Sequence, residues 1–148
     1  MEHKSKTKGR LYMGYLFVLA YVLLVGASTV LMKSTLKTID PFQLNFLMGI
    51  GMLVSGSLAL LIANKSFNIP IGELPLGILR GLMMALGSIF FTLAINEMPA
   101  GLASVLAATY VAVVIILSWI FLKESMDLIK IAGLAVTFIG VLMLSYKA

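Results

Sequence analysis

Polar side chains are sparse within the long apolar stretches of this sequence, and their types and spacing suit the binding of a solute. Thr29 and Lys33 lie four residues apart near the end of the first stretch, so they share one face of a helix. Ser88 and Thr92 have the same spacing in the third stretch, and Tyr110 lies inside the fourth. Hydroxyl groups donate and accept hydrogen bonds, and an ammonium attracts an anionic or dipolar group. We therefore predict that these five residues line a substrate pathway.

Several of these residues also have a purely structural interpretation. Lys33, like Arg80 in the third stretch, can extend its charged end to the membrane interface. The hydroxyls of Ser88 and Thr92 can bond to carbonyls of their own helix. Tyr110 can pack in the interior with its hydroxyl paired. From the sequence alone, both interpretations remain open.

Groups that would support catalysis or ion exchange are missing from the centres of the apolar stretches. The acidic residues and the single histidine fall elsewhere, at Glu2, His3, Asp40, Glu73, Glu97, Glu124 and Asp127. The chain has no cysteine, no glycine-rich phosphate loop and no set of nucleophile, base and orienting residue. The sequence predicts neither an enzyme nor a cofactor or metal site. A membrane-embedded carboxylate that exchanges a proton for a cation is also absent.

Five apolar stretches must position these polar residues. Each approaches the roughly 20 residues that a helix needs to cross the hydrocarbon layer, and 61% of all residues are hydrophobic, with a mean hydropathy of +1.08. Lipid offers no partner for backbone groups, and the stretches show no two-residue alternation, so we predict helices. The sequence predicts an all-α, polytopic membrane protein with a bundle of five transmembrane helices, at 12–32, 42–63, 74–95, 101–122 and 128–146.

The connectors leave room for one domain. We expect a basic cytoplasmic tail over residues 1–11 and a single membrane domain over 12–146, with no surface for nucleic acid. Asp40-Pro41 is expected to separate the first two helices, because the residue before proline leaves the α region and proline suits a first helical turn. Glu97-Met98-Pro99 predicts an abrupt hairpin between the third and fourth helices.

Small residues recur at every fourth position in two of the predicted helices. Such rows let helices approach closely in lipid, where burial from water no longer drives association. They pack helices within one subunit or form the seam of a dimer, and the sequence leaves both open. The rows are Gly77, Gly81 and Ala85 in the third helix, and Ser104, Ala108 and Ala112 in the fourth.

Several segments resemble the EamA-type domain of the drug/metabolite transporter superfamily. They are GASTVLMK at 26–33, Asp40-Pro41-Phe42, AINEMPAGLA at 94–103, WIFLKE at 119–124, and Gly133 with 139–141. The family often carries a proline where this chain has 109–111, and a basic residue where Met48 stands. The small multidrug resistance branch is also similar, but its first-helix glutamate would fall near Val25.

The resemblance implies a secondary transporter that is half of a carrier. We expect it to move a small metabolite or amphipathic compound across a prokaryotic inner membrane by alternating access, as a homodimer or with a homologous subunit. The alternatives are a lipid-linked sugar flippase subunit, an efflux subunit like those of small multidrug resistance, or a membrane scaffold without transport. The substrate, the direction of transport and the coupling ion are not predicted by the sequence.

Basic residues predict the orientation, because short cytoplasmic loops retain lysine and arginine. With the N-terminus inside, the inner side holds Lys4, Lys6, Lys8, Arg10, Lys65, Arg80, Lys123 and Lys130, whereas the outer side holds Lys33, Lys37 and Lys147. We therefore expect a reporter fused to the C-terminus to be active outside the cytoplasm. A mostly cytoplasmic reporter would contradict the span count, and equal populations in both orientations would indicate dual topology.

Overall fold

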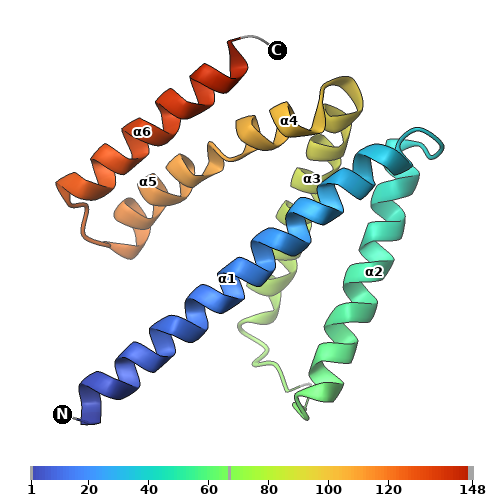
Figure 1. The fold of residues 1–148 in the computed structure, drawn as a ribbon. Helices are drawn as coiled ribbons and strands as arrows, with labels where there is room; N and C mark the ends of the chain where they lie inside the picture. The colour runs from blue at the N-terminus through green and yellow to red at the C-terminus, as the bar shows by residue number, and fades with distance from the viewer. Residues whose placement is uncertain (1, 67, 147–148) are drawn as a thin grey trace.

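The described chain is built from α-helices alone (Figure 1). The computed structural model describes the backbone of residues 2–66 and 68–146, and side chains at 12–66, 68–129, 131–144 and 146. This confirms the predicted all-α class. The side chains of the basic tail, Lys130 and Lys147 lie outside the described residues. The helices are α1 (Glu2–Thr35), α2 (Pro41–Ile62), α3 (Leu74–Glu97), α4 (Ala100–Ala107), α5 (Tyr110–Leu122) and α6 (Leu128–Ser145).

The helix boundaries follow from local chemistry in the connectors. Asp40 is the N-cap of α2, and its side chain accepts a hydrogen bond of 2.8 Å from the backbone N–H of Phe42. Pro41 occupies the first turn, as predicted. The hairpin at Met98-Pro99 ends α3 and starts α4, also as predicted. The backbone of the basic segment is helical from Glu2 and forms the first part of α1.

The fourth predicted helix is interrupted, which the sequence did not predict. At Ala108 and Thr109 the backbone tightens, and the N–H groups of Thr109, Val111 and Ala112 bond to carbonyls three residues earlier. The Thr109 hydroxyl also donates to the carbonyl of Leu106 over 2.6 Å. A hydroxyl that bonds to its own backbone competes with the regular helical ladder. The chain therefore divides into α4 and α5 without a proline.

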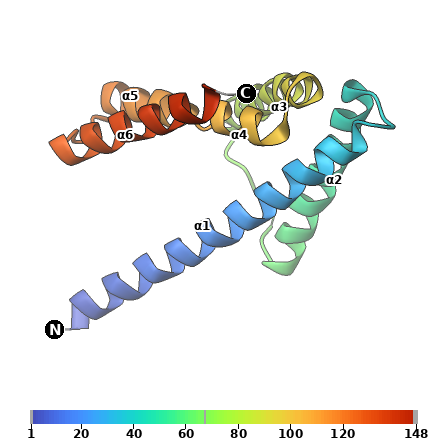
Figure 2. The same ribbon diagram turned by 45° about the horizontal axis from the view of Figure 1, so that its top comes forward.

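The buried core lies where α1, α2, α3 and α4 meet at one end of the molecule (Figures 1 and 2). We call this region the junction; its buried apolar residues are Met32, Leu44, Ile95 and Ala103. Away from the junction, α2 packs along α3 and α4 packs against α6. In both views the N-terminal half of α1 extends away from the other helices.

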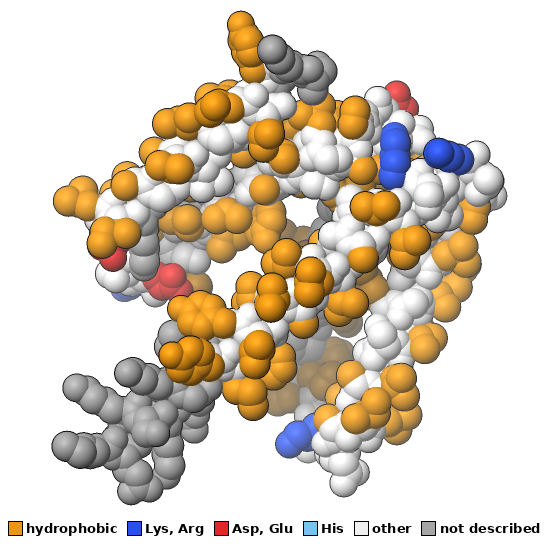
Figure 3. Space-filling model, viewed as in Figure 1, with side chains coloured by type: hydrophobic (Ala, Val, Ile, Leu, Met, Phe, Trp, Pro, Cys, Tyr) orange, Lys and Arg blue, Asp and Glu red, His pale blue; other side chains and the backbone are white. Residues whose placement is uncertain are grey.

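Apolar side chains are exposed over most of the remaining surface. In the view of Figure 3 they cover the helices, and charged side chains gather at helix ends. Among the described residues, four helical segments are long and apolar enough to cross a membrane: 12–35, 41–62, 74–97, and 100–122, which joins α4 to α5. The fifth predicted span corresponds to α6, of which the described apolar part is 131–144.

Candidate functional site

The junction brings together three of the residues predicted to line a pathway. Thr29 and Lys33 reach it from α1, and Thr92 reaches it from α3 with no exposed surface. The Thr92 hydroxyl donates to the carbonyl of Ser88 over 2.8 Å, and that of Thr29 donates to the carbonyl of Val25 over 2.9 Å. Both hydroxyls therefore bond back to their own helices.

Lys33 has a role that neither interpretation of the sequence included. Its ammonium donates hydrogen bonds to the carbonyls of Ile95, Asn96 and Met98, at the carboxyl end of α3. The last carbonyls of a helix have no partner within the helix, and the helix dipole makes this end negative. A lysine cation is suited to both conditions. Lys33 thus joins α1 to the hairpin between α3 and α4.

Ser88 makes a different contact, to a residue that the sequence analysis missed. Its hydroxyl donates to the side-chain oxygen of Asn45 on α2 over 2.6 Å, and the Asn45 amide donates to the carbonyl of Pro41 over 2.9 Å. The sequence did contain a signal for this residue: a polar amide in the second turn of an apolar helix needs a hydrogen-bond partner, which predicts a contact to another helix. The pair connects α2 to α3 near the middle of α3.

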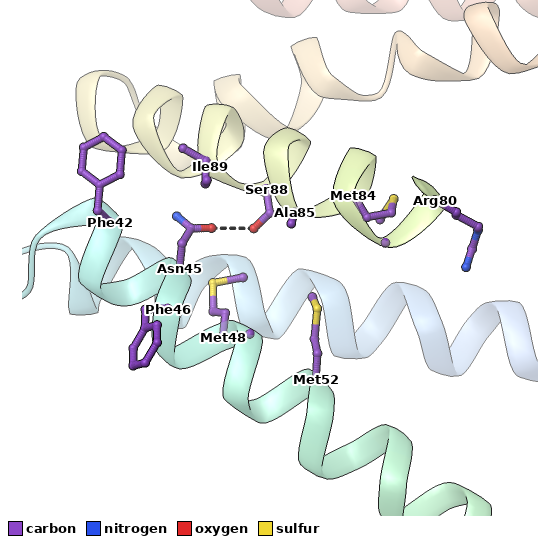
Figure 4. A pocket seen from close by; sticks show the side chains of 12 residues that line it. Phe42, Asn45, Phe46, Met48, Met52, Arg80, Met84, Ala85, Ser88 and Ile89 are labelled. Atoms are coloured by element: carbon purple, nitrogen blue, oxygen red, sulfur yellow. Dashed lines mark hydrogen bonds between the residues drawn. The ribbon is translucent and has the colours of Figure 1, made fainter. Parts of the chain in front are cut away.

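This pair lies at one end of a groove between α2 and α3 (Figure 4). The groove has a volume of about 570 Å³, which is within the usual range for small-molecule sites. Methionines line its length, and Arg80 lies at the end opposite the pair. The lining residues are Phe42, Asn45, Phe46, Met48, Gly49, Met52, Arg80, Gly81, Met84, Ala85, Ser88 and Ile89. We refer to this feature as the α2–α3 groove.

The groove lies at mid-height of the helix that forms one of its walls. At 1.5 Å per residue, Ser88 is about 4 Å and Arg80 about 8 Å from the midpoint of α3, on opposite sides of it. Arg80 is exposed. The lining therefore combines one cation, a hydroxyl–amide pair and flexible apolar side chains, and it contains no carboxylate. Such a site can bind and orient a solute without covalent chemistry.

Tyr110 does not join the other predicted pathway residues. It begins α5, just after the interruption, and its side chain is 58% exposed. Among the described residues, no group of three His, Cys, Asp or Glu side chains is arranged to hold a metal ion.

The two small-residue rows have different surroundings. A Cβ added at Gly77 or Gly81 would meet nothing within 4 Å among the described neighbours, so the α3 row faces open space there. Ala85 is exposed as well. In the other row, Ser104 donates to the carbonyl of Ala100 over 2.7 Å, Ala108 lies at the interruption, and Ala112 is buried.

Comparison with known proteins gives one match. The model of the EamA-like transporter family matches residues 12–146, which include α2 to α6 and α1 from Tyr12 onward. No curated protein and no solved structure matches the chain.

We predict that Lys33 stabilises the fold. Replacing Lys33 with methionine removes the donor for the α3 carbonyls while keeping a side chain of similar length. Hydrogen bonds to charged groups contribute about 1.5–3 kcal/mol, so the free energy of unfolding should fall by about that amount. Thermal denaturation in mild detergent would measure the change.

Lys37→Met is the matched control, because Lys37 is exposed in the turn after α1. Equal stability of the two variants would contradict the capping role. If Lys33→Met instead lost transport at unchanged stability, substrate attraction by Lys33 would be favoured.

Proposed function

The chain belongs to the EamA-like transporter family, and from this premise we propose that it is half of a carrier for a small metabolite or amphipathic compound. Two copies, or one copy and a homologous subunit, would enclose the solute and expose it alternately to the two sides of a prokaryotic inner membrane. Transport would require binding and conformational exchange, with no covalent step.

The observation that carries this proposal is the position of the α2–α3 groove. Secondary transporters commonly bind their solutes near the midplane, at the interface between two repeats. The groove spans the midpoint of α3, and Ser88 lies about 4 Å from that midpoint, bonded to Asn45 in the second turn of α2. Polar groups within a membrane-spanning segment are energetically costly, so their presence there points to a function. The pair and the groove together provide one wall of such a site.

The open side of the groove supports the need for a second unit. Gly77 and Gly81 on α3 face open space, so another helix backbone can approach that row closely. A second copy placed there would cover the groove and supply the opposite wall.

The alternatives make different demands on the groove. Proton-coupled exchange of the small multidrug resistance type would need a carboxylate, and the lining has none. A lipid-linked sugar flippase would need the lateral opening to remain after assembly. A scaffold would leave the groove unused.

The direct test is transport by the purified protein in vesicles, with the solutes drawn from metabolite extracts. In the proposed site the solute bonds to the Ser88 hydroxyl, which Ser88→Ala removes; one such hydrogen bond of about 1 kcal/mol corresponds to roughly a fivefold change. We therefore expect about a fivefold lower rate for this variant. Ser57→Ala is the control, because Ser57 is exposed on α2, bonds to the carbonyl of Leu53 and does not line the groove. Absence of transport for every solute would favour the scaffold.

We further predict a dimer that uses the α3 row. Gly77→Leu should disrupt the dimer in mild detergent, because a bulky side chain separates closely packed helices. Gly77 does not line the groove, so the variant leaves the binding wall unchanged. Light scattering would measure the oligomer, with Gly56→Leu on α2 as the control. If the Gly77→Leu variant remained a dimer, the α3 row would be excluded as the seam. If the wild-type protein were a monomer that transports, the half-carrier would be excluded.

A further inference from the structure

The charge at one end of the α2–α3 groove restricts what the groove can bind. Arg80 is the charged residue among those that line it, and no acidic residue joins it there. Its guanidinium stays ionised and presents a planar set of donors that matches a carboxylate, sulfonate or phosphate. Arg80 is about 9 Å into α3 from Leu74, in a segment that is apolar enough to span a membrane. An ion at such a depth favours a partner of opposite charge.

The length of the groove away from Arg80 favours an apolar body. Met48 and Met52 from α2 and Met84 from α3 line it. Methionine is unbranched and polarizable, so these side chains adapt to apolar ligands of different shapes. The volume of about 570 Å³ is sufficient for a ligand larger than a simple ion.

The opposite end sets the length of the ligand. The Asn45–Ser88 pair is eight residues along α3 from Arg80, a separation of about 12 Å in the helix. Figure 4 shows the pair and Arg80 at the two ends of the groove, with methionines between them. Along its length the groove therefore presents a cation, then an apolar wall, then a hydrogen-bonding pair.

We propose that the α2–α3 groove binds a free anionic amphiphile, whose acidic group contacts Arg80 and whose apolar body, about 12 Å long, lies along the methionines toward Asn45 and Ser88. This inference rests on the proposed carrier function and specifies its solute class. A cationic amphiphile is disfavoured, because it would place its charge beside Arg80 without a carboxylate to compensate.

A tryptophan placed in the groove would test this directly. Trp119 is the only tryptophan in the chain and does not line the groove. The double variant Trp119→Phe, Phe46→Trp therefore reports from the groove wall. In discs of zwitterionic phospholipid, three probes with a bromine at the far end of a ten-carbon chain would be titrated: a sulfonate, an alcohol and a trimethylammonium. The sulfonate remains charged at every working pH, and bromine quenches tryptophan on contact.

We expect saturable quenching by the sulfonate, with a Kd at least tenfold lower than for the other two probes. Arg80→Gln on this background should weaken sulfonate binding at least tenfold and leave the alcohol unchanged. Lys65→Gln is the control, because Lys65 follows the end of α2 and does not line the groove. Equal affinity for the three probes, or an unchanged Kd in Arg80→Gln, would overturn the proposal.

Two further measurements separate the possible failures. Anionic phospholipid added to the discs should raise the apparent Kd for the sulfonate less than tenfold; a larger rise would assign Arg80 to a lipid headgroup and overturn the free ligand. Sulfonate uptake into vesicles would be measured beside binding. Binding without transport would retain the anion site and reject the carrier, whereas transport of other solutes without anion preference would retain the carrier and reject the site.

Discussion

A helix that ends near the membrane boundary requires donors for its last carbonyl groups, and in this protein the ammonium of Lys33 supplies them for α3. The same bonds hold α1 against the hairpin that leads to α4. Around this contact lie the residues with the least exposure, Thr92 and Ile95, together with Met32. One cation that serves three carbonyls thus connects α1 to the α3–α4 hairpin, and α2 joins the junction through the packing of Leu44.

The α2–α3 groove begins where the junction ends. Leu44 on α2 is buried in the junction, and the next residue, Asn45, bonds to Ser88 and forms the polar end of the groove. Packing at the junction sets the separation of α2 and α3, because both helices are anchored there. The groove then continues along the exposed faces of both helices. This arrangement gives a packed end and an open wall, which would suit the proposed half-carrier, where a solute binds and one unit moves against a second.

Exposed apolar surface has a different meaning here from that in a water-soluble domain. Lipid covers such surface without the cost that water would impose, so association of helices depends on close packing and on paired polar groups. The structure contains both features, a surface for close packing and a paired polar contact, in separate places. Open glycines on α3 offer a close approach, and the Asn45–Ser88 pair fixes α2 beside α3. The interruption at Ala108–Thr109 separates α4, which contacts α1 and α3, from α5.

The sequence by itself determined the all-α class, the membrane-spanning segments and most helix ends, because these depend on local properties: the length of apolar runs, the Asp40-Pro41 cap and the proline at the α3–α4 hairpin. It also identified most of the polar side chains within the apolar stretches, but not Asn45. Only the tertiary structure decided their partners. Lys33 contacts carbonyls more than sixty residues away in the chain, and Ser88 on α3 bonds to Asn45 on α2. Helical periodicity relates only residues a few positions apart, so it could not predict these contacts. Thr92 and Tyr110 were both candidates in the sequence; packing buried the first completely and left the second exposed, since burial depends on which helices meet.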